Sequence, residues 1–191
     1  METVIQKSVF QHEKFFNLII EAHQNTNHKY DKYIPYEFHL HMALTIAKRF
    51  IHLIPVEYRA IVLAAVIAHD SIEDARLSYS DVKKLAIRCG ATEEEATMVA
   101  EMVRAVTNNG RGRDRDERMP DYIYEEILNT FFAVFVKLCD RLANVNYGLV
   151  TGGSMPSKYK KENPHFKLKL YTSGLYEDMW NELDNLFEKL S

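Results

Sequence analysis

Apolar residues recur at intervals of three and four positions along most of the chain, and this spacing places them on one face of an α-helix. Phe15, Leu18 and Ile19 follow it near the start of the chain, and a similar set follows Pro35. The expected helices lie, in chain order, at residues 15–22, 40–47, 56–74, 81–88, 92–106, 122–128, 130–147 and about 175–187. No stretch alternates between apolar and polar residues for long, so the sequence predicts an all-α fold.

Two of these helices have recognisable start signals. Ser80 is expected to cap the helix over residues 81–88, which would end at Gly90. Thr92 and Glu95 form the pattern of a capping box, in which each side chain bonds the backbone of the other residue. Both helices are therefore expected to begin close to these residues.

Other parts of the chain depart from this simple pattern. The helix expected at residues 56–74 is apolar on almost every side, so we expect it at the centre of a helical bundle. The run at residues 131–138 would also suit a strand, but it continues into KLCDRLAN, whose residues favour a helix. Residues 108–119 are polar, contain glycine and are expected to form a loop, and residues 151–161 form a second polar stretch.

Length and composition limit the class of protein. With 191 residues the chain is expected to form a single domain over residues 1–191, with a motif-bearing core at about 22–147 and a C-terminal helical segment at about 172–190. A net charge of −3 supplies no basic field for nucleic acid. The longest apolar run, residues 60–68, is too short to cross a membrane, and the N-terminal residues do not resemble a signal peptide. Two cysteines make no disulfide framework, so a cytoplasmic location is expected.

The segment AAVIAHDSIEDA at residues 64–75 is the first that contains a group of candidate functional residues. A buried apolar helix there presents His69, Asp70, Glu73 and Asp74. Helical offsets of four would place His69 above Glu73 and Asp70 above Asp74. Four ionisable groups at the end of a core helix are costly unless they are hydrated or bind a cation. This segment alone is compatible with a solvated helix end and with a metal site.

Two further segments favour the metal site. YIPYEFHLHMA carries His39 and His41 near the start of a helix, and VKLCDRLANV carries Asp140 among apolar neighbours. Aspartate rarely lies inside a buried helix without a partner. Together with His69 and Asp70, these segments supply two imidazoles and two carboxylates, which is enough to hold a divalent cation and leave positions open for water and substrate.

The residue patterns of these segments, and their order along the chain, resemble those of the HD-domain phosphohydrolases. The resemblance is closest to the hydrolase domain of the RelA/SpoT group and its stand-alone small alarmone hydrolases. That group has a Tyr-x-x-His element, a His-Asp-x-x-Glu-Asp element, a Val-Thr element and a Lys-Leu-x-Asp-Arg-Leu-x-Asn element. The corresponding segments here, in the same order, are residues 36–39, 69–74, 106–107 and 137–144. The combination of HDSIED with KLCDRLAN is the most specific part of the resemblance.

The resemblance implies a role for each matching residue. The expected metal ligands are His39, His69, Asp70 and Asp140, and manganese is the metal associated with the group. The expected catalytic pair is Glu73 and Asp74, one of which would orient and deprotonate the attacking water. The expected substrate-binding residues are His28, Lys29 and Asn144, and His23 matches an Ala-His element near the start of the pattern.

The chain also departs from the pattern. His28 stands where the group usually has arginine, which weakens a stacking and bidentate contact to a base. Ala75 replaces the threonine that commonly follows the Glu-Asp pair, and Asn108 follows Val106-Thr107 where a charged residue is frequent. These departures leave the metal ligands intact and place the preferred base in question.

Several other residues are further candidates for a functional role. His41 competes with His39 as a ligand, and the spacing from Tyr36 favours His39. Cys139 is expected to be a core residue, because one helical position turns it away from Asp140. Two basic clusters could contact phosphate or simply face solvent. They are Arg111, Arg113, Arg115 and Arg118 in one case, and Lys158, Lys160 and Lys161 in the other.

The expected activity is removal of the 3′-pyrophosphate from guanosine 3′,5′-bis(diphosphate) or its pentaphosphate counterpart. The expected partner is this nucleotide substrate, without nucleic acid or membrane, and the sequence does not indicate the oligomeric state. Another HD-type phosphatase, acting on a nucleoside monophosphate or on NADPH, is the first alternative. The second is a module that binds a nucleotide or a protein without catalysis. A complete ligand set argues against the second, since an inactive site need not keep every ligand.

Overall fold

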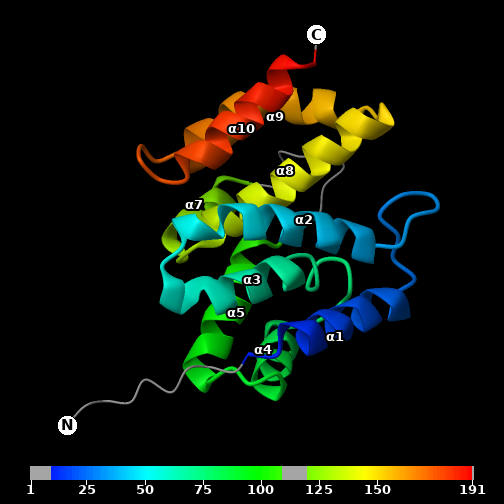
Figure 1. Ribbon diagram of the computed structural model, residues 1–191, viewed down its shortest axis with the longest axis vertical. Coiled ribbons are helices and arrows are strands. Elements are labelled where there is room, and N and C mark those ends of the chain that lie inside the picture. Colours follow the sequence, from blue (N-terminus) through cyan, green and yellow to red (C-terminus); the bar gives the residue numbers. More distant parts are fainter. Residues whose placement is uncertain (1–9, 109–119, 191) are drawn as a thin grey trace.

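The computed structural model describes residues 10–108 and 120–190, and this part of the chain is helical without any β-strand (Figure 1). An isolated bridge between Lys29 and Pro35 closes the loop between the first two helices. Short 3₁₀ turns lie at Ile51–Leu53 and Val56–Tyr58. The α-helices are α1 (His12–Asn25), α2 (Glu37–Phe50), α3 (Arg59–Ala68), α4 (Tyr79–Arg88), α5 (Glu93–Val106), α7 (Asp121–Asn129), α8 (Ala133–Thr151), α9 (Met155–Leu170) and α10 (Glu177–Glu188). The all-α prediction is confirmed for these residues.

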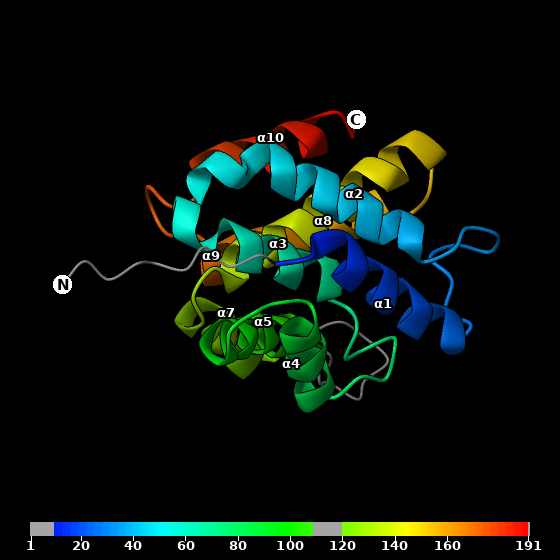
Figure 2. The ribbon, with the colours of Figure 1, turned by 60° about the horizontal axis from the view of Figure 1, so that its bottom comes forward.

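Helix α3 lies at the centre of the molecule, as its apolar composition predicts. It packs against α1, α2, α5 and α8, and its residues from Ile61 to Ala68 are almost all buried (Figures 1 and 2). Helix α8 is the second central element, because it packs against α2 on one side and against α9 and α10 on another. The C-terminal end of α3 therefore lies against the middle of α8 in the interior of the fold.

Helix α3 ends earlier than the sequence predicts. The expected helix at residues 56–74 begins with a 3₁₀ turn and is α-helical only to Ala68, so His69 to Asp74 lie in consecutive turns. Aspartate and serine compete with the helix for backbone hydrogen bonds, which explains the break after the apolar stretch. One helical bond persists, from the Asp74 N–H to the Asp70 carbonyl at 2.8 Å. The predicted continuation of this helix to residue 74 is therefore wrong.

The N-cap of α4 is Ser78 rather than Ser80. Ser78 Oγ accepts a hydrogen bond from the Asp81 N–H at 3.2 Å, and Asp81 Oδ2 accepts one from the Ser78 N–H at 2.9 Å. The expected capping box of Thr92 and Glu95 is present at the start of α5. Two serines separated by a single residue make the position of the cap ambiguous in the sequence.

Replacing Ser78 by alanine is expected to destabilise the protein by about 1 kcal/mol, because it leaves a helix N-terminal N–H without its acceptor. Ser80→Ala is the matched control and should leave the unfolding free energy almost unchanged, since Ser80 is exposed within the first turn of α4. Urea unfolding of both variants measures the difference. Equal loss in the two variants would contradict the assignment of the cap.

Helix α9 occupies much of the polar stretch that the sequence left without structure. Pro156 lies in its first turn, where a missing N–H costs nothing. Its buried residues include Tyr159 and Phe166, and the Arg141 guanidinium of α8 lies 4.3 Å and 4.0 Å from their ring centroids. A Cβ atom at Gly148 would lie 2.4 Å from Pro156, so α8 and α9 can approach this closely only with glycine there.

Helix α10 packs against α8, and its Trp180 contacts α9. Trp180 is 1% exposed and packs against Phe166, with ring centroids 5.5 Å apart. Trp180 therefore packs within the chain. Among the described residues, no helix is both long and apolar enough to span a membrane.

Candidate functional site

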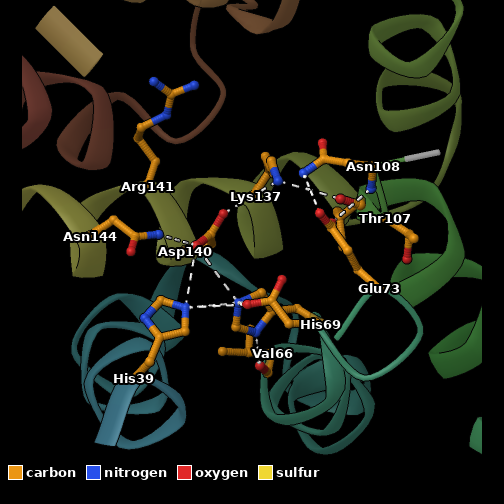
Figure 3. Close-up of polar contacts among 12 residues, drawn as sticks. His39, Val66, His69, Glu73, Thr107, Asn108, Lys137, Asp140, Arg141 and Asn144 are labelled. Carbon is orange, nitrogen blue, oxygen red and sulfur yellow. Dashed lines mark hydrogen bonds and ion pairs between the residues drawn. The ribbon is translucent and has the colours of Figure 1, made fainter. Parts of the chain in front are cut away.

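Four ionisable residues from three segments meet between α2, α3 and α8. His39 comes from the first turn of α2, His69 and Asp70 directly follow α3, and Asp140 comes from the middle of α8. Their ligand atoms all lie within 4.8 Å of one another. Figure 3 shows the rings of His39 and His69 below Asp140, with both imidazoles directed toward its carboxylate. We call these four residues the ligand cluster.

The spacing of the ligand atoms suits a small divalent cation. Metal bonds of about 2.0–2.2 Å place neighbouring ligand atoms about 3.0–3.5 Å apart. In the cluster, His39 Nε2 lies 3.1 Å from His69 Nε2 and 3.4 Å from Asp140 Oδ1. His69 Nε2 lies 2.8 Å from Asp70 Oδ2 and 3.7 Å from Asp140 Oδ1. Two imidazole nitrogens and two carboxylate oxygens are also a donor set that manganese and zinc accept.

The backbone fixes the orientation of one imidazole. His69 Nδ1 donates a hydrogen bond to the Val66 carbonyl at 2.8 Å, and a carbonyl oxygen can only accept. Neutral His69 therefore carries its lone pair on Nε2, which is the nitrogen that faces the cluster. His39 is held differently, since its ring stacks on Tyr30 with centroids 4.7 Å apart.

The cluster is strongly coupled by charge. Burial alone would raise the pKa of Asp70 and Asp140, but the neighbouring His69 outweighs this effect at Asp70, and Lys137 with the two histidines outweighs it at Asp140. Both carboxyl pKa values are consequently lowered. Burial would lower the pKa of His39 and His69, but these two carboxylates raise it. Positive charge in the cluster, either as protons on the imidazoles or as a cation, therefore stabilises the two carboxylates.

Three further side chains orient the carboxylates. The Tyr36 hydroxyl donates to Asp70 Oδ2, and Asn144 Nδ2 donates to Asp140 Oδ1 at 2.5 Å. Lys137 Nζ lies 3.3 Å from Asp140 Oδ2 and is 4% exposed. Sequence reasoning assigned no role to Lys137 or to the Tyr36 hydroxyl. The available signal for Lys137 was its position three residues before Asp140 on a buried helix.

The two acidic residues of the expected catalytic pair lie beside the cluster. Glu73 accepts hydrogen bonds from the backbone N–H and side-chain amide of Asn108, at 3.1 Å and 3.3 Å (Figure 3). Its pKa is raised by desolvation and by the charge of Asp70. Burial, then Asp70 and Glu73, raise the pKa of Asp74 to about 7. The two carboxyl groups therefore have different partners, and Asp74 titrates near neutrality.

The three expected substrate-binding residues differ in their positions and contacts relative to the ligand cluster. His28 lies close to the cluster, since its ring packs on Tyr36 with centroids 4.2 Å apart and its Nε2 lies 3.7 Å from Asp74 Oδ1. Lys29 is exposed on the loop between α1 and α2. Asn144 already bonds two protein groups, because its Oδ1 also accepts from the Tyr30 hydroxyl at 2.8 Å. The structure thus gives Asn144 an orienting contact to the cluster.

His23 is buried behind this group of rings. It is 1% exposed and stacks on Tyr36 with centroids 4.4 Å apart. Burial lowers its pKa to about 4, so the imidazole is neutral at physiological pH. Within the described part of the chain, neither ring nitrogen has a hydrogen-bond partner.

The remaining candidates lie away from the cluster or outside the described residues. His41 is exposed on α2 and packs on Phe16, with centroids 4.5 Å apart. Cys139 is fully buried, as expected for a core residue. Lys160 bonds the Leu190 carbonyl at 2.7 Å, and Lys158 and Lys161 are exposed. Four arginines lie outside the described residues, namely Arg111, Arg113, Arg115 and Arg118.

Surface hollows do not mark this site by size. A hollow of about 600 Å³ runs along α1 and is lined by residues such as His12 and Asn17, none of which belongs to the ligand cluster.

Searches against protein-family models, curated proteins and solved structures found no match for the chain. The donor set, the spacing and the charges of the cluster are therefore the features that indicate a function.

Proposed function

We propose that the protein is a metal-dependent phosphohydrolase of the HD type that acts on a nucleotide. The observation that carries the proposal is the ligand cluster, because His39, His69, Asp70 and Asp140 are the four residues that the HD pattern implies as ligands. They come from three separate segments, and their ligand atoms lie within 4.8 Å of one another. Helix packing alone gives no reason to gather two imidazoles and two carboxylates in the interior of the fold.

The residues around the cluster fit phosphoryl chemistry. A bound divalent cation, for which manganese is our proposal, would supply Lewis acidity to a phosphoryl oxygen and to water. Under this proposal Glu73 accepts a proton from the attacking water as the water oxygen bonds to phosphorus. Asp74, with a pKa of about 7, returns a proton to the oxygen that leaves when the phosphorus–oxygen bond breaks. The buried ammonium of Lys137 adds positive charge next to Asp140.

The specific reaction that we propose is hydrolysis of the 3′-diphosphate of guanosine 3′,5′-bis(diphosphate) to pyrophosphate. The support is the intact Glu73-Asp74 pair within HDSIED, together with KLCDRLAN. Under this proposal His28 and Lys29 lie on the base side of the site, as the resemblance implies. His28 packs on Tyr36 close to the cluster, which is compatible with that position.

Release of pyrophosphate from this nucleotide, measured with manganese and with a chelator, tests the proposal. We expect release that depends on manganese, together with about one metal ion bound per chain. Bound metal without release would move the activity to another nucleotide, such as NADPH or a nucleoside monophosphate. Failure to bind any divalent metal would overturn the hydrolase proposal and favour a binding module.

A further inference from the structure

Three aromatic side chains form a continuous run from the ligand cluster to the surface. Tyr30 stacks on the cluster residue His39, with centroids 4.7 Å apart and planes 15° apart. Tyr147 meets Tyr30 edge-on at 4.8 Å, and Phe38 meets Tyr147 edge-on at 5.9 Å. The rings come from the α1–α2 loop, from the second half of α8 and from the first turn of α2, and these segments lie on the same side of the molecule (Figure 1).

Hydrogen bonds hold the two tyrosines in this run. The Tyr30 hydroxyl donates to Asn144 Oδ1, and the Tyr147 hydroxyl donates to Asp31 Oδ2, each at 2.8 Å. Because each phenol is tethered at its polar end, its ring cannot turn freely. The rings are therefore fixed relative to the ligand cluster before any substrate arrives.

The outer end of the run is open to solvent. Phe38 is 43% exposed, and Tyr147 is partly exposed. An exposed aromatic ring is poorly explained by core packing, and the exposed rings of Phe38 and Tyr147 offer aromatic faces next to an ionic site. Planar bases stack on such rings through their π-faces, and this interaction depends little on which base is present.

We propose that Tyr30, Tyr147 and Phe38 form a wall that binds the nucleobase of the substrate. This inference rests on the proposed phosphohydrolase function, because the ligand cluster then receives the phosphate end of the same molecule. It assigns the substrate to molecules that carry a planar base. Sugar phosphates and inorganic polyphosphates have no group that would cover the rings.

Binding measurements with two ligands test the wall. Guanosine 3′,5′-bisphosphate carries the base, and ribose 3,5-bisphosphate carries the same phosphates without it. Calorimetric titration of the manganese-loaded wild type should show tighter binding of the nucleotide by about fivefold to about 100-fold, the range expected for one stacked base. Tyr147→Leu and Phe38→Leu should remove most of this preference and leave binding of the ribose compound unchanged.

Three controls separate recognition from structure. Tyr147→Phe keeps the ring and should keep the preference for the nucleotide. Tyr33→Leu removes a ring that is 79% exposed on the same loop but outside the run, and it should change neither affinity. Tyr30 is left in place because its ring also supports His39. Thermal unfolding checks that each variant is folded as the wild type is.

The outcomes distinguish this inference from the proposed function. Equal affinity of wild type for the two ligands, or an equal loss for both in Tyr147→Leu, would overturn the wall while leaving a site for phosphate. Failure of the metal-loaded wild type to bind either ligand would overturn the proposed function and the wall with it. A preference that falls only in the variants without a ring would establish the wall.

Discussion

Replacement of Asp140 by asparagine should lower the affinity for manganese by about 100-fold or more and remove measurable turnover. Asp140 is the ligand supplied by α8, and its Oδ1 lies within 3.7 Å of both cluster imidazoles. Even residues that only orient metal ligands change affinity by about 10- to 100-fold when replaced, so loss of a charged ligand should cost at least as much. Metal content after dialysis and pyrophosphate release from the same samples measure both effects.

Asparagine is the informative substitution at this position. Alanine would leave the Lys137 ammonium, which is 4% exposed, without any acceptor at this position, and this alone would destabilise the fold. Asparagine keeps the volume of the side chain and one oxygen that can accept from Lys137. Retention of wild-type metal content and turnover by Asp140→Asn would exclude the ligand cluster as the site of chemistry.

The two histidines of α2 provide a matched pair for the same question. His39→Ala should lose metal in the same way as Asp140→Asn. His41→Ala should bind metal normally, because its exposed ring packs on Phe16 and not in the cluster. The pair controls for general effects of removing an imidazole from α2.

Much of the fold could be predicted from local sequence because the helices carry strong periodic signals. The capping box at Thr92 and the fully apolar face of α3 each give an unambiguous local pattern. Helix α9 was not predicted, because its polar residues and internal Pro164 give a weak pattern. Its stability comes from contacts distant in sequence, among them the packing of Arg141 on Tyr159 and Phe166.

The candidate site likewise combines features that local sequence predicts with features that depend on contacts between distant segments. The sequence indicates the four ligands because each is an ionisable residue within an apolar segment, and the resemblance gives their order. It does not indicate that α3 ends at Ala68, which is why the predicted helix extends too far, to residue 74. Side-chain partners from other helices, such as Tyr30 on Asn144, depend on packing that no local pattern contains.

Replacement of Glu73 by glutamine should preserve the fold and the bound metal but reduce kcat by about 10²- to 10⁴-fold, the usual contribution of a general base. Glutamine keeps the shape of the side chain and an oxygen that can accept from Asn108, whereas it cannot take a proton from water. Metal content, the unfolding midpoint and the rate of pyrophosphate release are measured on one preparation. Full activity in Glu73→Gln would remove Glu73 from the mechanism.

The dependence of kcat/KM on pH provides an independent test of the same pair of acids. A base acts only when deprotonated, so activity should fall on the acid side as pH drops through the raised pKa of Glu73. An acid acts only when protonated, so activity should also fall on the alkaline side, above the pKa of Asp74 near 7. A cation in the cluster would offset the charge of Asp70, which contributes to both raised pKa values, and would move both limbs to lower pH.

Single substitutions should then separate the two limbs. The residual activity of Glu73→Gln should lose the acid limb, and that of Asp74→Asn should lose the alkaline limb, because each variant lacks one titrating group. Glu93→Gln changes an exposed glutamate at the start of α5 and should leave the profile unaltered. If Glu73→Gln instead lost the alkaline limb, the roles of the two acids would be exchanged, with Asp74 as the base beside the cluster.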